Sequence, residues 1–133
     1  MKKLVLLALV AFAVARAIPA TRPKTEPIVE WARAKGGPYA RPVIDPVLRW
    51  SANDEARNIA HGLLRRDRVW GDLPHPSKLQ QFIRRWSFCG DCQDPWGSPY
   101  GILVRSDSII VWSLGPDRTS DTGDEIRTGG SRN

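Results

Sequence analysis

The chain has 133 residues, of which 20 are basic and 14 acidic, giving a formal net charge of +6. A chain of this length forms one domain and excludes two well-filled hydrophobic cores, so any function must lie on a single small scaffold. Arginines are scattered from Arg22 to Arg132 without aromatic residues interleaved among them. This pattern indicates a solvated surface and argues against nucleic-acid binding.

Residues 1–17 have the order of a secretory signal peptide. Lys2 and Lys3 form a positive start, Leu4 to Val14 form a short apolar run, and Ala15-Arg16-Ala17 provides a small-residue cleavage site. We predict cleavage after Ala17, export to the periplasm or the extracellular space, and a mature net charge of +3. The alternative is that this segment stays uncleaved and serves as an anchor. Only in that case would the chain contact a membrane, and only through this segment. Eleven apolar residues fall short of the roughly 20 that a membrane-spanning helix needs.

Residues 18–50 are rich in proline and are predicted to form an extended linker. Six prolines and the pair Gly36-Gly37 lie between Ile18 and Pro46, a density that disfavours a long helix. Ordered structure is therefore expected to begin near Ser51, with one globular domain over residues 51–127 and a flexible tail over residues 128–133.

The globular domain is predicted to start with its main helix. Ser51 is typical of an N-cap, and Asp54 three residues later resembles the partner of a capping box. Apolar residues at helical spacing then define one face of about four turns that ends before Gly71. These residues are Ala52, Ala56, Ile59, Ala60, Leu63 and Leu64. The opposite face carries Arg57, Arg65, Arg66 and Arg68, and is predicted to be solvated.

The rest of the domain is predicted to add a short helix and a hairpin. Helical spacing of apolar residues indicates a helix from about Ser77 to Trp86, with its aromatic residues in the core. Two β-rich runs, 100–105 and 108–113, are separated by Ser106-Asp107, which predicts an antiparallel hairpin. The fold class is therefore α+β, with one main helix and a short helix packed on a small antiparallel sheet. The predicted core is Ile59, Leu63, Leu64, Phe82, Ile83, Trp96, Ile102, Val104, Ile109, Val111 and Trp112.

Cys89 and Cys92 form a C-x-x-C motif in a chain that is predicted to be exported. Oxidising conditions favour a disulfide, and we interpret the pair as a structural link within a loop. A redox site would need the motif between a strand and a helix N-terminus. A metal site would need two further ligands, and His61 and His75 are the only histidines.

Residues 114–125 contain the densest group of potential metal ligands. Four carboxylates, Asp117, Asp121, Asp124 and Glu125, are interspersed with Gly, Ser and Thr. Oxygen ligands without His or Cys favour calcium over zinc, although the spacing is not that of an EF-hand. On composition alone, a solvated acidic loop is an equally good interpretation.

Two motifs resemble the carboxy-terminal domain of the major pseudopilin of type II secretion systems. They are D-P-W-G-S-P-Y at residues 94–100 and W-S-L-G-P-D at residues 112–117, in the family's order with the hairpin between them. The resemblance covers roughly residues 51–127 and implies a pseudopilin-like fold. It also implies that Asp94 caps the turn, that Gly97 has positive φ, and that Trp96 and Tyr100 lie on the helix.

In that family the loop after S-L-G binds calcium, so the resemblance also implies a ligand set. Carried over by position, Leu114 and Thr122 offer carbonyl groups, and Asp117 and Asp124 offer side chains. Asp121 and Glu125 are further ligands. Arg118 stands where the family prefers Gly, which puts the backbone of the loop in doubt.

The chain departs from major pseudopilins at its start. It lacks the Phe-Thr-Leu-Ile-Glu stretch and the long apolar helix that packs the filament, so it cannot join such a filament in the usual way. The resemblance therefore implies a non-enzymatic exported module that acts by protein interaction. Its partners would be pseudopilins or other components of type II secretion or the cell envelope. The alternatives are a stand-alone calcium-stabilised secreted domain and a thiol-disulfide enzyme that uses Cys89 and Cys92.

Overall fold

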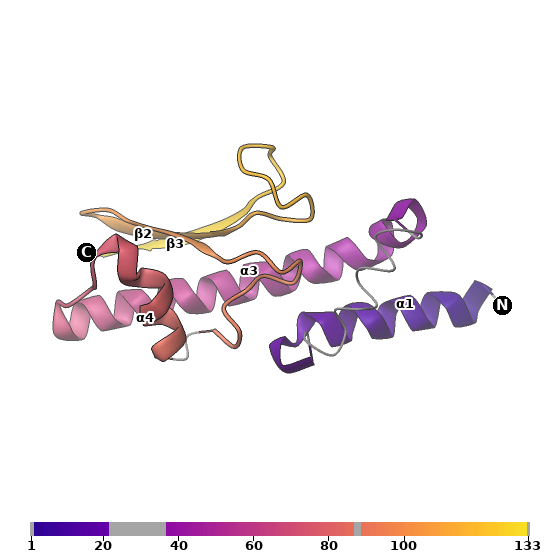
Figure 1. Ribbon diagram of the computed structural model, residues 1–133, viewed down its shortest axis with the longest axis horizontal. Helices are drawn as coiled ribbons and strands as arrows, with labels where there is room; N and C mark the ends of the chain where they lie inside the picture. Colours follow the sequence, from indigo (N-terminus) through magenta and orange to yellow (C-terminus); the bar gives the residue numbers. More distant parts are fainter. Residues whose placement is uncertain (1, 22–36, 87–88, 133) are drawn as a thin grey trace.

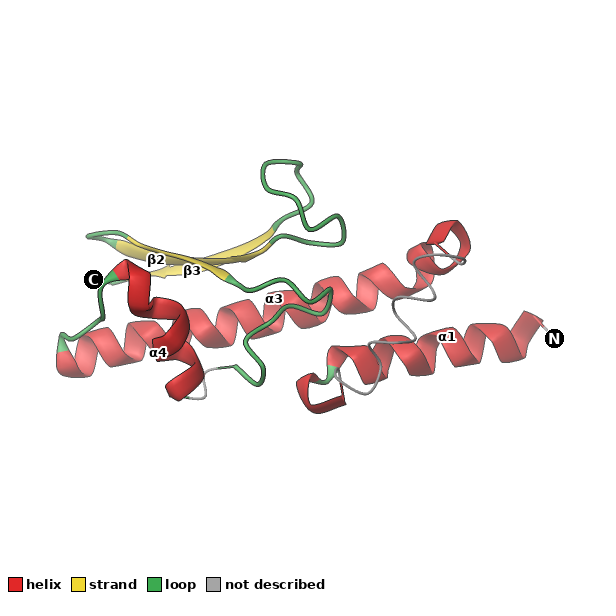
Figure 2. Cartoon of the chain, in the orientation of Figure 1, coloured by secondary structure: helices red, strands yellow, loops and turns green. Residues whose placement is uncertain are grey.

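A computed structural model describes residues 2–21, 37–86 and 89–132 (Figure 1). Within these residues the chain is an α+β protein with three α-helices and one three-stranded antiparallel sheet (Figure 2). The fold class predicted from the sequence is therefore confirmed. The helices are α1 (Lys2–Ala17), α3 (Gly37–Trp70) and α4 (Leu79–Arg85), and the strands are β1 (Gly101–Val104), β2 (Ser108–Ser113) and β3 (Ile126–Ser131). Short 3-10 turns precede α4 and follow α1, at Pro76–Lys78 and Pro19–Thr21.

The main helix, α3, begins at Gly37 and not at Ser51. The prediction of an extended linker is thus wrong for residues 37–50, while residues 22–36 lie outside the described residues. Ser51 is not an N-cap. It lies inside the helix, where its hydroxyl donates to the carbonyl of Ala17 at 2.9 Å and to Glu55 Oε1 at 3.3 Å.

The prolines of α3 are tolerated because of where they fall on the helix. Pro42 and Pro46 are four residues apart, so both lie on one exposed side. Ile44 and Leu48 lie on another side and are buried. Packing of that buried side offsets the backbone hydrogen bonds that the two prolines cannot make, which is a case of tertiary contacts overriding local propensity.

The sheet has the strand order β1-β2-β3 and lies over the carboxy-terminal part of α3 (Figure 1). The predicted hairpin is confirmed, with Val104 opposite Ile109 and the turn at Ser106-Asp107. The third strand was not predicted, and the expectation of a flexible tail from residue 128 is wrong. Gly130 in β3 packs directly on α3, since a Cβ there would lie 2.6 Å from Leu64 Cδ1. The position that needs glycine is Gly129, where a Cβ would lie 2.6 Å from the backbone oxygen of Ile109, although sequence propensity argues against a strand there.

The core between α3 and the sheet follows the predicted helical periodicity. All six apolar residues predicted for the buried face of the helix are buried. All of them except Ala52 pack with Leu79 and Ile83 of α4 and with Ile109 and Val111 of β2, whereas Ala52 belongs to a second cluster. Of the remaining predicted core residues, Trp96 is buried in a second cluster, and four are half-buried: Phe82, Ile102, Val104 and Trp112.

The first helix, α1, lies along the amino-terminal part of α3 (Figure 1). Ala13 packs with Leu48 and Trp96, and Arg16 is 1% exposed, with its Nε donating to the carbonyl of Pro95 at 2.8 Å. In the described part of the chain, no helix is both long enough and apolar enough to cross a membrane. Cleavage after Ala17 stays a prediction, and it would uncover the side of Trp96 and α3 that α1 covers.

A bidentate ion pair fixes the end of the chain to α3. Arg132 donates from Nε and Nη2 to the two carboxylate oxygens of Asp67, each at 2.7 Å, and from Nη1 to the carbonyl of Arg105 at 2.7 Å. The Asp67 side chain is only 11% exposed. The hydrogen bonds from Arg132 lower the pKa of Asp67 below its ordinary value.

We expect Arg132→Gln to lower the free energy of unfolding at pH 7 by about 1–2 kcal/mol. The pKa of Asp67 is depressed in the folded state, so this stabilisation is present above the unfolded pKa of about 3.9. It is lost as the pH falls through the folded pKa. Urea denaturation of both proteins from pH 7 to pH 2 should show the difference shrinking at acid pH. A difference that stays constant would contradict the assignment, and Arg57→Gln, at an exposed position, is the control.

Candidate functional site

Asp94 is the point at which the two motif segments, 94–100 and 112–117, meet. Its carboxylate is fully buried, and Oδ1 accepts hydrogen bonds from the backbone N–H groups of Trp96 at 3.1 Å and Ser98 at 2.8 Å. Oδ2 accepts from the hydroxyl of Ser113, at the end of β2, at 2.6 Å. Ser113 Oγ in turn accepts from the N–H of Gly115 at 3.0 Å. One side chain thus caps the turn, as predicted, and fixes it to the loop that follows β2.

The aromatic residues of this turn attach it to α3, as predicted. Tyr100 is fully buried, and its hydroxyl donates to Glu55 Oε2 at 2.9 Å. Trp96 is buried against α3 and is hydrogen-bonded to the side chain of Asp45. Burial raises the pKa of Asp45 above its ordinary value, even though the hydrogen bond from Trp96 and the charge of Arg49 act in the opposite direction.

The predicted metal ligands lie in the loop between β2 and β3, residues 114–125, which projects beyond the sheet (Figure 2). Leu114 and Asp124 are half-buried, whereas Asp117, Asp121 and Thr122 are exposed. Hydrogen bonds from Thr122 and Thr119 lower the pKa of Asp117.

Glu125 closes this loop from within. Its carboxylate accepts hydrogen bonds from the N–H groups of Asp121 and Gly123, the second at 3.1 Å. Hydrogen bonds from backbone N–H groups, first of all its own, lower the pKa of Glu125.

Arg118, which stands where the pseudopilin family prefers glycine, has φ of 57°. The backbone is therefore left-handed at this position although the residue is not glycine. The guanidinium of Arg118 donates to the carbonyl of Trp96.

A cation from the chain itself reaches the predicted calcium ligands. Arg49 of α3 donates from Nη2 to Asp124 Oδ1 at 3.0 Å and from Nη1 to the Asp124 carbonyl at 3.5 Å. Its charge also contributes to the lowered pKa of Asp117. Among residues 2–21, 37–86 and 89–132, no three His, Cys, Asp or Glu side chains converge as a metal-binding group. In this structure the cation at Asp124 is therefore the guanidinium of Arg49, with which a calcium ion would have to compete.

Cys89 and Cys92 form a disulfide, as predicted. Cys89 is 8% exposed and Cys92 is fully buried, and both belong to the core cluster between α3, α4 and the sheet. Thiol–disulfide exchange requires access of an attacking thiolate to a sulfur. This burial fits a structural link within the segment that connects α4 to the turn at residues 94–100.

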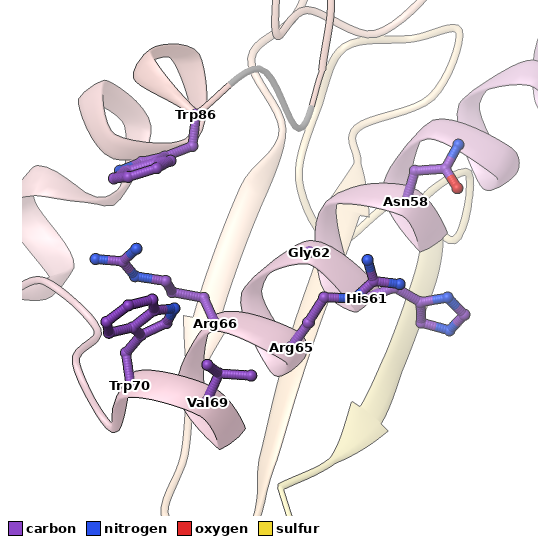
Figure 3. Close-up of a pocket in the computed structure, with 8 residues that line it drawn as sticks. All are labelled: Asn58, His61, Gly62, Arg65, Arg66, Val69, Trp70 and Trp86. Carbon is purple, nitrogen blue, oxygen red and sulfur yellow. The ribbon is translucent and has the colours of Figure 1, made fainter.

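An open groove between the end of α3 and α4 is a feature that the sequence analysis missed (Figure 3). We call it the aromatic–arginine groove. The guanidinium of Arg66 lies between two indole rings, 4.5 Å from the ring centroid of Trp86 and 5.3 Å from that of Trp70. The groove is lined by Asn58, His61, Gly62, Arg65, Arg66, Val69, Trp70 and Trp86.

The groove corrects two predictions from the sequence. Trp86, predicted to belong to the core, is 47% exposed. Arg66, predicted to be solvated, has a side chain that is only 20% exposed. The two tryptophans come from different helices, so no single stretch of sequence shows them together. The available signal was the spacing of Arg66, Val69 and Trp70 at i, i+3 and i+4 on the polar side of the helix.

In comparisons with known proteins, this chain matches no family model, no curated protein and no solved structure. Its function must therefore be inferred from the Asp94 network, the acidic loop and the aromatic–arginine groove.

Proposed function

We propose that this chain is an exported, non-enzymatic module with a pseudopilin-like domain, which acts by binding other proteins in type II secretion or the cell envelope. The observation that carries the proposal is the Asp94 network. It joins the two segments, 94–100 and 112–117, whose sequences resemble the major pseudopilin. Two motifs that meet at one buried carboxylate form a single structural unit, which is more specific than either motif alone.

Other features support export and binding. A buried disulfide suits an oxidising compartment such as the periplasm or the extracellular space. The α1 helix coincides with the predicted signal segment. Exposed tryptophans next to arginines are typical of surfaces that bind proteins.

Co-purification tests this function. The full-length gene with a carboxy-terminal tag is expressed in its source organism, and the proteins bound to the tagged product are identified. We expect pseudopilins or other secretion components to be enriched over a tagged exported control protein. No such enrichment would favour the alternative, a stand-alone secreted domain unconnected with secretion.

Calcium binding by the loop is a second part of the proposal. The carbonyls of Leu114 and Thr122 and the side chains of Asp117, Asp121 and Asp124 would hold the ion, which neutralises the carboxylates and joins the ends of the loop. A ligand that binds only the folded state at ten times its Kd adds about 1.4 kcal/mol to stability. Because Arg49 already pairs with Asp124, calcium must displace it, and the gain in the natural protein is reduced.

We therefore expect Arg49→Met to make the protein more dependent on calcium. In a chelator the variant should melt several degrees below the natural protein, and millimolar calcium should recover most of the loss. The natural protein should gain fewer degrees, and Asp117→Ala should abolish both gains. The measurement is a thermal melt of each protein in calcium and in chelator. If calcium shifts the midpoint of neither protein, the loop is a solvated acidic loop held by Arg49.

A further inference from the structure

We propose that the aromatic–arginine groove is the partner-binding surface of this protein, and that its occupant is an acidic peptide segment of another protein with an apolar side chain at its centre. The proposal rests on the proposed function only in that the chain acts by binding proteins. It is carried by the exposed rings, by the held guanidinium of Arg66 and by the charge of the two helices.

The apolar part of the groove is exposed in the folded chain. Val69 and Trp70 are 64% and 68% exposed, and Trp86 faces them from α4 at 47%. Contiguous apolar side chains of this size that stay exposed commonly mark interaction sites. Tryptophan and arginine are also the residues most enriched among those that dominate binding energies. An apolar side chain laid against the exposed edges of these rings would remove this surface from water.

Arg66 is held in place with unused hydrogen-bonding capacity. Besides the two indole rings, its guanidinium contacts the ring of Phe82, with the centroid at 5.8 Å. Its nearest carboxylate is Asp72, at 3.9 Å and 77% exposed, and in the described part of the chain its buried Nε has no hydrogen-bond partner. A guanidinium fixed by stacking loses little freedom on binding and can take a carboxylate with two parallel hydrogen bonds.

The charge around the groove selects an acidic occupant. Residues 57–86 carry seven basic and two acidic side chains, a net charge of +5. One of the two acids, Asp67, is already paired with Arg132. Such a field attracts acidic segments and speeds their association.

A second copy of this chain is a poorer occupant. Its acidic part is the loop at residues 114–125, where Asp124 is paired with Arg49 and Glu125 accepts from N–H groups of the loop. The apolar residue of that loop, Leu114, is half-buried, so it is not free to cover the exposed edges of Trp70 and Trp86. The proposed occupant therefore combines acidic and apolar side chains, which this loop does not offer together at an exposed site.

The test uses three labelled heptapeptides and fluorescence anisotropy with the purified protein from the full-length gene. The first has six Asp or Glu residues around a central Leu, the second has Ser in place of Leu, and the third has Lys in place of the acids. We expect the first peptide to bind, with affinity falling as salt rises. The serine and lysine peptides should each bind at least tenfold more weakly.

Matched variants locate the site. Trp70→Ala and Arg66→Gln should each weaken the first peptide at least tenfold. The control for Trp70 is Trp50→Ala, since Trp50 is equally exposed, at 68%, on the same helix but is not part of the groove. Arg57→Gln is the control for loss of a single positive charge. Trp70 is exposed, so its variant tests the groove even if Arg66→Gln lowers stability.

Several results would overturn the proposal. One is that Trp70→Ala and Trp50→Ala bind the first peptide equally well. Another is that the leucine and serine peptides bind the natural protein equally well. A third is that the protein binds phosphatidylglycerol vesicles but not the first peptide. Self-association that Trp70→Ala abolishes would make a second copy the occupant. Failure of the groove and failure of the proposed function are distinguishable. If pseudopilins co-purify with Trp70→Ala as strongly as with the natural protein, the proposed function stands and the groove is not the binding surface. If the peptide binds but no secretion component is enriched in the co-purification, the groove stands and the proposed function fails.

Discussion

Replacing Asp94 with alanine is expected to lower the free energy of unfolding by about 3 kcal/mol and the thermal midpoint by about 10 °C. The substitution leaves three donors without an acceptor in a buried site, namely the N–H groups of Trp96 and Ser98 and the hydroxyl of Ser113. A buried polar group that loses its partner loses about 1–3 kcal/mol, and neighbouring losses are not additive. Urea denaturation and thermal melts measure both quantities.

Two further variants show whether the cost arises from the network. Ser113→Ala removes one donor to Asp94 and the acceptor of the Gly115 N–H, and its cost should be smaller than that of Asp94→Ala. The double variant should cost much less than the sum of the two single costs, because each already breaks the bond between β2 and the turn. Asp107→Ala, at an exposed carboxylate, should change stability by less than about 0.5 kcal/mol. A cost below about 1 kcal/mol for Asp94→Ala would mean that the turn and the loop are not joined through this carboxylate.

The elements that could be predicted are those whose local pattern and final packing agree. The face that includes Ile59 and Leu63 has a helical period, and it is the face that α3 buries against the sheet. The runs around Ile102 and Ile109 have β propensity and a short connection, and they pair as predicted. In both cases the signal that forms the element is contained in the element itself.

The elements that could not be predicted depend on partners far away in the sequence. The amino-terminal part of α3 contains prolines and is nevertheless helical, since Ile44 and Leu48 pack on α1 and Trp96. The strand β3 contains Gly129 and Gly130, which have low strand propensity, but a Cβ on Gly129 would clash with the backbone oxygen of Ile109 in the neighbouring strand. Each segment is stabilised by tertiary contacts that a local sequence window does not contain.

The candidate sites divide in the same way. The acidic residues of the loop are close in sequence, so their placement in one loop after the hairpin could be predicted, although β3, the strand that follows the loop, could not. The pairing of Asp124 with Arg49, 75 residues away, could not. The aromatic–arginine groove was missed for the same reason, because Trp86 reaches Arg66 only through the packing of α4 on α3.

Gly115 is expected to be as sensitive as Asp94, for steric reasons. Its φ of 81° lies in the region that L side chains rarely adopt, and a Cβ there would lie 2.3 Å from the carbonyl oxygen of Asp124. The left-handed backbone alone costs a non-glycine residue about 1–2 kcal/mol. Crowding against a backbone atom adds a comparable amount, because the strand that follows must shift. Gly115→Ala should therefore lower the free energy of unfolding by about 3 kcal/mol, measured by urea denaturation.

Gly123→Ala is the matched control in the same loop. Gly123 has φ of 84°, almost the same as Gly115, but a Cβ there meets no atom within 4 Å. Its alanine variant should show the backbone strain alone, about 1–2 kcal/mol. The difference between the two variants then measures how firmly Asp124 is held against the end of β2. Equal costs would mean that the Asp124 carbonyl moves away freely, and that neither Arg49 nor a bound calcium ion fixes this end of the loop.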